Sequence, residues 1–65
     1  MKIIVNGDTI VLDDAITIEA LVNQLAITEK IAVELNEEIV PRSQFAQTIL
    51  GPDDQIEIVR AIGGG

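Results

Sequence analysis

The sequence ends on three consecutive glycines, Gly63-Gly64-Gly65, and the reactive group at this end is the α-carboxylate of Gly65. Glycine has no side chain to pack and loses more backbone freedom than any other residue when it becomes ordered. Three extended residues span roughly 10 Å, and without Cβ atoms they fit a slot that any side chain would block. We therefore expect residues 63–65 to form a flexible tail that carries the Gly65 carboxylate into a partner's active site.

Two simpler interpretations of the same tail stay open. Chain termini commonly fray, and small residues suit a fraying end. A run of glycines is also typical of an artificial linker. The rest of the chain has to decide between these interpretations and the functional one.

The side chains that most often perform catalysis are missing. The sequence has no Cys, no His, no Tyr and no Trp, and its one aromatic residue is Phe45. It therefore lacks a thiolate nucleophile, a disulfide, the commonest general base and the commonest metal ligand. Three adjacent acidic pairs show no calcium-type spacing, and turn and cap positions account for them. We expect a protein that is acted on by partner enzymes, is not itself an enzyme, and binds no metal or cofactor of its own.

The net charge of −7, from eleven acidic and four basic residues, limits the classes of partner. Binding to a phosphate backbone needs clustered Lys and Arg, so nucleic acid is excluded, and an anionic membrane surface is excluded on the same ground. The acidic charge either keeps a small apolar domain soluble or complements a basic face on a partner. The apolar run at residues 3–5 is far too short for a signal peptide or a membrane span, which predicts a cytoplasmic protein.

The body that must position the tail is a single small domain, over residues 1–62. Ile, Val and Leu dominate a composition that is 48% hydrophobic, and β-branched residues favour pleated sheets. Alternating patterns and turn signals predict strands at residues 2–5, 9–12, 31–35, 39–40 and 55–60. Asn6-Gly7 predicts a tight hairpin turn between the first two strands, and Asn36-Glu37-Glu38 predicts another turn.

One amphipathic helix of about ten residues is expected between the second and third strands. Thr17 is its expected N-cap, and Glu19 in the first turn suits the helix dipole. The apolar stripe recurs at helical spacing in Ile18, Leu21, Val22 and Leu25. Such a short helix is not stable alone, so the stripe must lie on the sheet. A further helical turn is expected at residues 42–46, with Phe45 filling the core beneath it.

This order of elements predicts an α+β fold with one main helix on one face of a mixed sheet of four to five strands. If the first and last strands are neighbours at the centre, they must be parallel, and a right-handed crossover through the helix allows this. That arrangement is the β-grasp, or ubiquitin-like, fold.

Two segments resemble a known family. Residues 33–42, Val-Glu-Leu-Asn-Glu-Glu-Ile-Val-Pro-Arg, resemble the LNxxIVPR segment of the ThiS family, the bacterial sulfur carriers of thiamin biosynthesis. Residues 54–65 are similar to the DxIEIVxxxGGG ending of that family. The opening strand with Asn6-Gly7 also fits, so the resemblance covers essentially the whole chain.

The resemblance implies a function that needs no catalytic side chains. An adenylating, E1-like enzyme would use ATP to activate the carboxylate of Gly65, and a sulfur donor such as a cysteine desulfurase would supply the sulfur of a thiocarboxylate. Gly63 and Gly64 would thread the partner's channel. The thiocarboxylate would then deliver its sulfur to thiazole synthase.

A docking surface next to the tail is expected on the open side of the sheet. Val59 points away from the buried face of Ile56 and Ile58, and contiguous exposed apolar surface often marks a partner site. The predicted surface consists of Ala32, Val59, Arg60, Ala61 and Ile62. Scattered surface hydrophobic residues and an ordinary surface salt bridge of Arg60 or Arg42 are the alternatives.

Two other functions stay open. The chain could be a sulfur carrier of another pathway, as the small subunit of molybdopterin synthase or in tRNA thiolation. It could also be a ubiquitin-like binding module without carrier chemistry, for which a free carboxylate on Gly65 would not matter.

Overall fold

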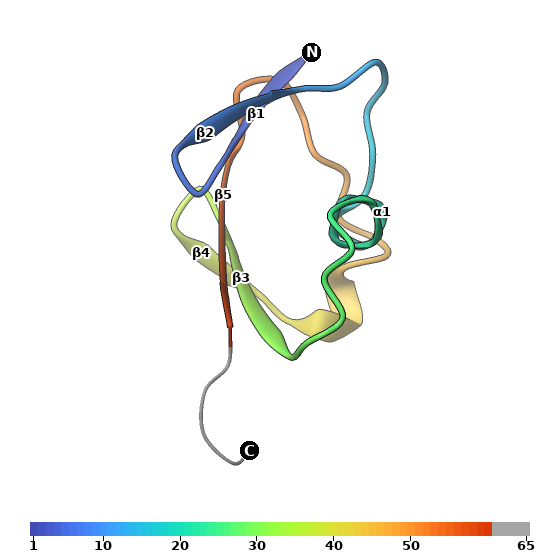
Figure 1. Cartoon of the computed structure of the whole chain (residues 1–65), viewed down its shortest axis with the longest axis vertical. Helices are drawn as coiled ribbons and strands as arrows, with labels where there is room; N and C mark the ends of the chain where they lie inside the picture. The colour runs from blue at the N-terminus through green and yellow to red at the C-terminus, as the bar shows by residue number, and fades with distance from the viewer. Residues whose placement is uncertain (61–65) are drawn as a thin grey trace.

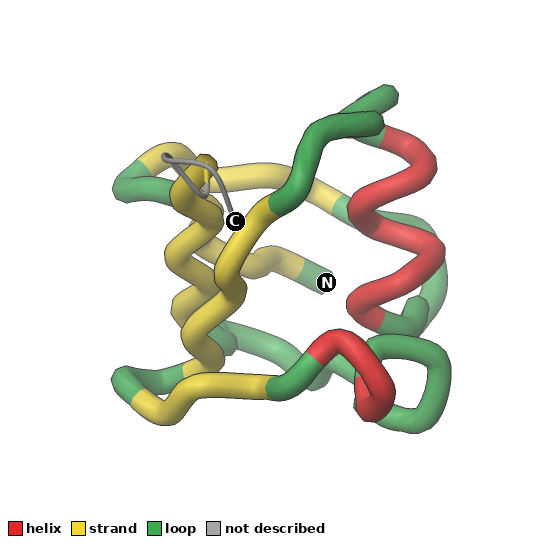
Figure 2. The backbone as a smooth tube through the Cα atoms, turned by 90° about the horizontal axis from the view of Figure 1, so that it is seen from below, coloured by secondary structure: helices red, strands yellow, loops and turns green. Residues whose placement is uncertain are grey.

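The computed structural model describes residues 1–60, and it arranges them in two layers, a sheet and a helical layer (Figures 1 and 2). The elements in chain order are β1 (Lys2–Val5), β2 (Asp8–Val11), α1 (Ile18–Gln24), β3 (Ile31–Leu35), β4 (Glu38–Val40), the 3-10 helix η1 (Arg42–Gln44) and β5 (Gln55–Arg60). Residues 61–65 lie outside the described part, and the predicted domain boundary at residue 62 stays a prediction.

The sheet has the strand order β2-β1-β5-β3-β4. The first and last strands are neighbours at its centre and run parallel, with Ile4 opposite Gln55 and Val5 opposite Ile56. The other neighbouring strands are antiparallel. This is the predicted β-grasp arrangement, with five strands within residues 1–60.

Both hairpins close through two residues with positive φ. Asn6 and Gly7 have φ of 51° and 85°, and Asn36 and Glu37 have φ of 50° and 72°. Positive φ at both central residues gives the turn a twist that matches the twist of the flanking strands. The second turn is one residue shorter than predicted, because Glu38 already belongs to β4.

The helix begins where the sequence predicted and ends early. The Thr17 side chain accepts a hydrogen bond of 3.1 Å from the backbone N–H of Ala20, which caps the first turn. α1 has seven residues instead of about ten. It stops because the chain enters the left-handed region at Ala26, where φ is 58°.

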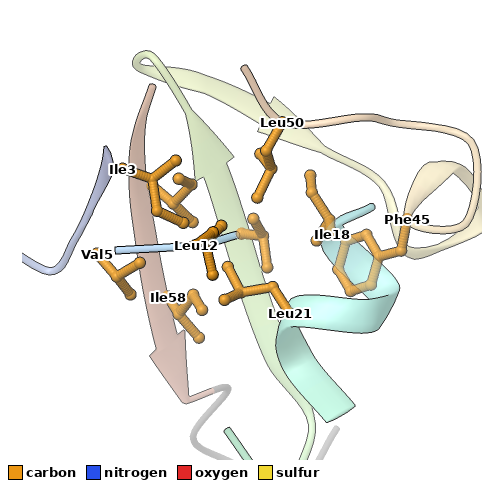
Figure 3. Packing of buried hydrophobic residues seen from close by; sticks show 10 residues of the cluster. Ile3, Val5, Leu12, Ile18, Leu21, Phe45, Leu50 and Ile58 are labelled. Atoms are coloured by element: carbon orange, nitrogen blue, oxygen red, sulfur yellow. The ribbon is translucent and has the colours of Figure 1, made fainter. Parts of the chain in front are cut away.

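The core lies between the sheet and the helical layer, where the buried side chains point toward one another (Figure 3). It consists of Ile3, Val5, Leu12, Ile18, Leu21, Val33, Phe45, Leu50, Ile56 and Ile58. Phe45 is buried, as predicted. Leu50, in the connection between η1 and β5, is also fully buried, although the sequence analysis assigned it no role. A hydrogen bond from its backbone N–H to the carbonyl of Ile16 holds this connection against the segment before α1.

The predicted burial of one helical residue, Leu25, is wrong. Leu25 was expected to lie on the sheet with the rest of the helical stripe, but it is 37% exposed. The reason is that Leu25 is the C-cap of α1, so it sits where the chain leaves the helix. Ile18 and Leu21 carry the buried face, and Val22 is half-buried.

Candidate functional site

The candidate site is the end of β5, because this central strand leads directly to residues 61–65 (Figure 1). The five residues whose predicted roles depend most on the tail are outside the described part: Ala61, Ile62, Gly63, Gly64 and Gly65. Their roles in docking, threading and modification therefore stay predictions. The structure does show how β5 is held in place as far as Arg60, the last described residue.

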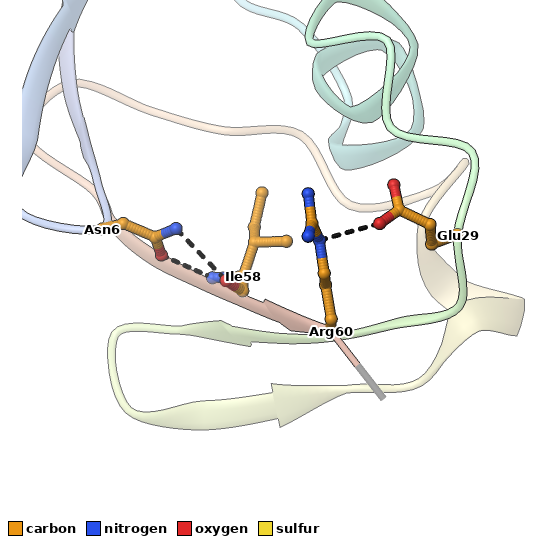
Figure 4. Close-up of polar contacts among 4 residues, drawn as sticks. All are labelled: Asn6, Glu29, Ile58 and Arg60. Atoms are coloured by element: carbon orange, nitrogen blue, oxygen red, sulfur yellow. Dashed lines mark hydrogen bonds and ion pairs between the residues drawn. The ribbon is translucent and has the colours of Figure 1, made fainter. Parts of the chain in front are cut away.

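Asn6 extends the contact between β1 and β5 beyond the point where the two strands stop pairing. Its side-chain Oδ1 accepts from the backbone N–H of Ile58 at 2.7 Å, and its Nδ2 donates to the Ile58 carbonyl at 3.1 Å (Figure 4). The amide thus takes the place of the next residue of a parallel strand. Without it, the backbone of β5 would lose its partner on the β1 side after Ile56.

Asn36 does the same at the beginning of β5. Its backbone N–H donates to the Gln55 carbonyl at 2.8 Å, and its Oδ1 accepts from the Gln55 N–H at 3.0 Å. Its Nδ2 donates to Oδ1 of Asp54 at 3.1 Å. The two hairpin asparagines therefore hold β5 near both of its ends.

Val59 and Ala32 lie where the sequence predicted. They are opposite each other in the β3–β5 register, on the face of the sheet away from the helix. Both are exposed, Val59 by 54%. Their orientation is confirmed, and their use in docking stays a prediction.

Arg60 does not share that face. It alternates with Val59 and so projects to the helical side, where its Nε forms an ion pair of 2.8 Å with Oε2 of Glu29 (Figure 4). There it lines a pocket of about 180 Å³ together with Val5, Asn6, Leu25, Ile27, Ile31 and Ile58. The three described residues of the predicted docking surface therefore divide over two faces, Ala32 and Val59 on the open face and Arg60 on the helical side.

Arg42, the other arginine considered, lies far from the end of β5 along the chain. It lines a separate pocket of about 370 Å³ between α1 and the η1 segment, with Glu19, Val22, Asn23, Ile27, Thr28 and Phe45. Arg42 therefore lies next to α1 and not beside Val59 on the open face of the sheet.

Sequence reasoning missed three residues of the open face. Glu34 and Glu57 are opposite each other on β3 and β5, and Ile39 of β4 is opposite Glu34. Ile39 is 77% exposed. Alternation along β3 puts Glu34 on the outward face, but it does not show which residue of a neighbouring strand lies opposite.

Within residues 1–60, no group of three or more acidic residues is placed to hold a metal ion. A helix long and apolar enough to cross a membrane is likewise absent from that part of the chain.

Comparison with known proteins adds to this geometry. The sequence model of the ThiS family matches residues 2–65, nearly the whole chain and all three terminal glycines. The chain belongs to the ThiS family. A crystal structure of the thiamine biosynthesis protein ThiS from Geobacter metallireducens is 29% identical, covers both chains completely and superposes with a TM-score of 0.89. A solution structure of a thiamine biosynthesis protein from the same organism is 30% identical, with a TM-score of 0.80, and it covers this chain completely and 88% of the other.

Other relatives of this ThiS-family chain include proteins named thiazole synthase. One from Paramagnetospirillum magneticum is 44% identical and one from Magnetococcus marinus is 42% identical, both over 66 aligned positions that cover this chain completely. The chain spans only about a fifth of the length of these curated relatives, 20% in each case. An uncharacterized protein, ycf40, from Pyropia yezoensis is 33% identical, and the match covers 93% of its length.

Proposed function

We propose that this chain is a sulfur carrier of thiamin biosynthesis that works through the carboxylate of Gly65. The observation that carries the proposal is the ThiS-family match, which runs to residue 65 and so includes the three glycines. The fold supports it, because β5 is a central strand held near both ends and leads directly to those glycines. The absence of His and Cys is no obstacle, since a carrier leaves acid–base and nucleophilic chemistry to its partners.

The proposed reaction takes place stepwise on Gly65. In an adenylating, E1-like enzyme, a carboxylate oxygen attacks the α-phosphorus of ATP and pyrophosphate leaves. A donor such as a cysteine desulfurase carries its sulfur as a persulfide, and in the second step the terminal sulfur attacks the carbonyl carbon of the acyl-adenylate while AMP leaves. A thiol reductant then cleaves the S–S bond of the acyl disulfide, which leaves the sulfur on Gly65 and oxidises the thiol and the donor cysteine to a disulfide. The product is a thiocarboxylate. Gly63 and Gly64 serve as the narrow segment that lets this group reach the active site.

Thiazole synthase is the proposed acceptor of the sulfur. The two relatives named thiazole synthase contain a segment like this chain within a much longer protein. That arrangement favours thiazole synthase over molybdopterin synthase or a tRNA-thiolating enzyme as the partner of the present chain.

The proposal is tested by the intact mass of the protein after incubation with ATP, the adenylating enzyme of the family and a sulfur source. We expect a mass gain equal to the replacement of one oxygen by one sulfur. Deletion of Gly65, and addition of one residue after it, should each abolish the gain. Both variants leave residues 1–60 untouched, so their unfolding curves should match that of the original chain.

A mass that stays unchanged, while the same enzyme activates a known carrier, would reject the carrier function. The chain would then be a ubiquitin-like binding module. A sulfur-loaded protein that supplies no sulfur to thiazole synthase would keep the carrier chemistry and move it to another pathway.

A further inference from the structure

β2 forms one edge of the sheet, and within residues 1–60 its outer side pairs with no other strand (Figure 1). Leu12, just after β2, exchanges two backbone hydrogen bonds with Met1, of 2.6 and 2.8 Å. Hydrogen-bonded residues alternate along an antiparallel pair of strands. Val11 and Thr9 therefore direct their backbone N–H and C=O groups away from β1. These backbone groups are placed to pair with one more strand.

The other edge of the sheet is protected against such pairing, and the β2 edge is not. β4, at the other edge, has only three residues and is followed directly by Pro41, which has no N–H to donate. β2 has four residues and no proline, and its Val11 is 74% exposed. An edge strand that carries an exposed apolar residue is a template for a further strand.

A hollow lies beside the end of β2, between this strand and α1. It has a volume of about 260 Å³ and is lined by Val11, Leu12, Asp13, Asp14, Ile16 and Gln24. Leu12 is buried and Ile16 is half-buried, so the inner part of the hollow is apolar. Side chains of an added strand would point alternately to the two faces of the sheet. Those on the helical side would meet the hollow, and those on the open side would meet Val11.

Acidic side chains stand at both ends of β2. Asp8 is its first residue, and Asp13 and Asp14 follow shortly after its last. All three are exposed, and none of them forms an ion pair within residues 1–60. The neighbouring strand contributes Lys2 and the N-terminal ammonium as cations, fewer than the three carboxylates. The edge is therefore net acidic and complements a basic partner.

We propose that β2 is a docking edge for an extended segment of a partner protein, with apolar residues at its middle and lysine or arginine toward its ends. The segment adds a sixth strand to the sheet through the backbone of Thr9 and Val11. Its apolar side chains enter the hollow and cover Val11, and its cations meet the acidic side chains at the two ends of β2. Backbone pairing supplies the affinity, and the side-chain contacts supply the specificity.

The docking edge is remote from the proposed reactive end. Val11 is opposite Lys2 at the start of β1, and β1 runs parallel to β5. The end of β2 therefore lies where β5 begins, and β5 ends at the opposite end of the sheet (Figure 1). A partner bound at β2 leaves the end of β5 accessible. Under the proposed carrier function, such a partner holds the protein while a second enzyme acts on Gly65, but the docking itself does not depend on that function.

A second copy of this chain fits the edge less well. Antiparallel pairing of two β2 strands through Thr9 and Val11 would place Asp13 of each copy near Asp8 of the other. Each copy also has a net charge of −7. Nucleic acid and anionic lipid would meet the same repulsion and have no peptide backbone to pair with the strand. An extended basic peptide is the complementary occupant.

The test uses a synthetic peptide with blocked ends, in which a Val-Ile-Val centre is flanked by two lysines on each side. Its binding to the full-length protein is followed by backbone amide chemical shifts and by calorimetry. We expect saturable binding with the largest shifts at residues 9–14. The same peptide with an N-methylated centre keeps its side chains but loses its central backbone donors, and a third peptide has glutamates in place of the lysines. Each control peptide should bind at least about tenfold more weakly.

A proline variant tests the strand pairing from the protein side. Val11→Pro removes an N–H that points away from β1, so the β1–β2 ladder keeps its hydrogen bonds. Ile39→Pro makes the same change on β4, where Ile39 is likewise an outward position by the alternation after the two-residue turn. We expect Val11→Pro to weaken peptide binding at least about fivefold and Ile39→Pro to leave it within about twofold. If Val11→Pro fails to fold, the N-methylated peptide on the original protein decides the same point.

A pair of charge variants tests the acidic ends. Asp13→Asn/Asp14→Asn removes two carboxylates beside the hollow, and Glu37→Gln/Glu38→Gln removes two exposed carboxylates at the other edge of the sheet. The two variants change the net charge equally. At low salt the aspartate variant should bind the lysine peptide at least about threefold more weakly, and the glutamate variant should stay close to the original protein.

Several results would overturn the inference. Equal binding of the N-methylated peptide would show that no strand is added, and equal binding of the glutamate peptide would show that the acidic ends play no part. Shifts centred away from β2, or no saturable binding at about 1 mM lysine peptide, would reject the edge as a docking site. A dimer of the original protein that dissociates in Val11→Pro would assign the edge to a second copy of the chain.

The docking edge and the carrier function fail separately. If the protein gains sulfur but the lysine peptide does not bind at β2, the carrier function stands and the docking edge falls. If the peptide binds at β2 but the protein never gains sulfur, the docking edge stands and the carrier function falls.

Discussion

The side-chain amide of Asn6 makes two hydrogen bonds with the backbone of Ile58, although the two residues are 52 positions apart in sequence. Oδ1 accepts from the Ile58 N–H at 2.7 Å, and Nδ2 donates to the Ile58 carbonyl at 3.1 Å. The amide therefore acts as one more rung of the parallel β1–β5 ladder. A turn residue of the first hairpin thus holds the strand that leads to the proposed reactive end.

Replacement of Asn6 by glycine should lower the free energy of unfolding by about 1–3 kcal/mol, because it leaves the half-buried polar groups of Ile58 without these partners. Glycine accepts the φ of 51° found at this position, so the loss reports on the side chain and not on backbone strain. Urea unfolding followed by circular dichroism measures the effect. Asn23→Ala, at an exposed position of α1, is the control and should change the stability by less than about 0.5 kcal/mol.

Asn6→Asp separates the two hydrogen bonds. The carboxylate keeps an acceptor for the Ile58 N–H but offers no donor to the Ile58 carbonyl. This variant should therefore also unfold at a lower urea concentration than the original protein. Unfolding curves of the glycine and aspartate variants that superpose on the original would contradict the role assigned to Asn6.

Leu21 and Leu25 look equivalent in the sequence but should respond differently to truncation. Leu21 is fully buried, so Leu21→Ala leaves a cavity and should cost about 2–5 kcal/mol. Leu25 is 37% exposed, and Leu25→Ala should cost clearly less than the Leu21 variant. Thermal unfolding of the two variants side by side checks the difference. Equal losses would mean that Leu25 belongs to the core, as the helical periodicity alone predicted.

Glu37 is a site where the chain can be made more stable. Its φ of 72° lies in the left-handed region, which disfavours residues with a Cβ atom by about 1–2 kcal/mol. Glu37→Gly should raise the free energy of unfolding by about 0.5–1 kcal/mol, after allowance for the greater backbone freedom of glycine in the unfolded chain. The matched control is Glu38→Gly, in β4, which should lower the stability. A melting temperature that falls in both variants would count against this explanation.

The ion pair between Arg60 and Glu29 should contribute little to stability. Its side chains are 77% and 50% exposed, and exposed pairs are typically worth about 0–1 kcal/mol. A double-mutant cycle with Arg60→Gln and Glu29→Gln should give a coupling energy in this range that disappears in about 1 M salt, where the Debye length is about 3 Å. A coupling well above 1 kcal/mol that persists in salt would show that the pair is a structural element.

Much of the fold could be predicted because its signals are local. Alternating apolar residues located the strands, helical spacing located α1, and Asn6-Gly7 located a hairpin turn. Each of these patterns reflects the backbone geometry of a few neighbouring residues. The terminal glycines predicted, through their missing side chains, a tail suited to chemistry at the Gly65 carboxylate, and this stays a prediction.

The tertiary structure decided the relationships that depend on register between distant segments. Only the β3–β5 register places Glu34 opposite Glu57, and only the packing of the connection before β3 brings Glu29 to Arg60 on the helical side. The exposure of Leu25 follows from where α1 stops, which the periodicity of its stripe does not encode. The sequence by itself determined which elements form, and it led to the proposal that the Gly65 carboxylate is the reactive group. The neighbours of those elements were decided by the joint packing of the whole chain, because a side-chain pattern within one strand carries no information about which residue of another strand will face it.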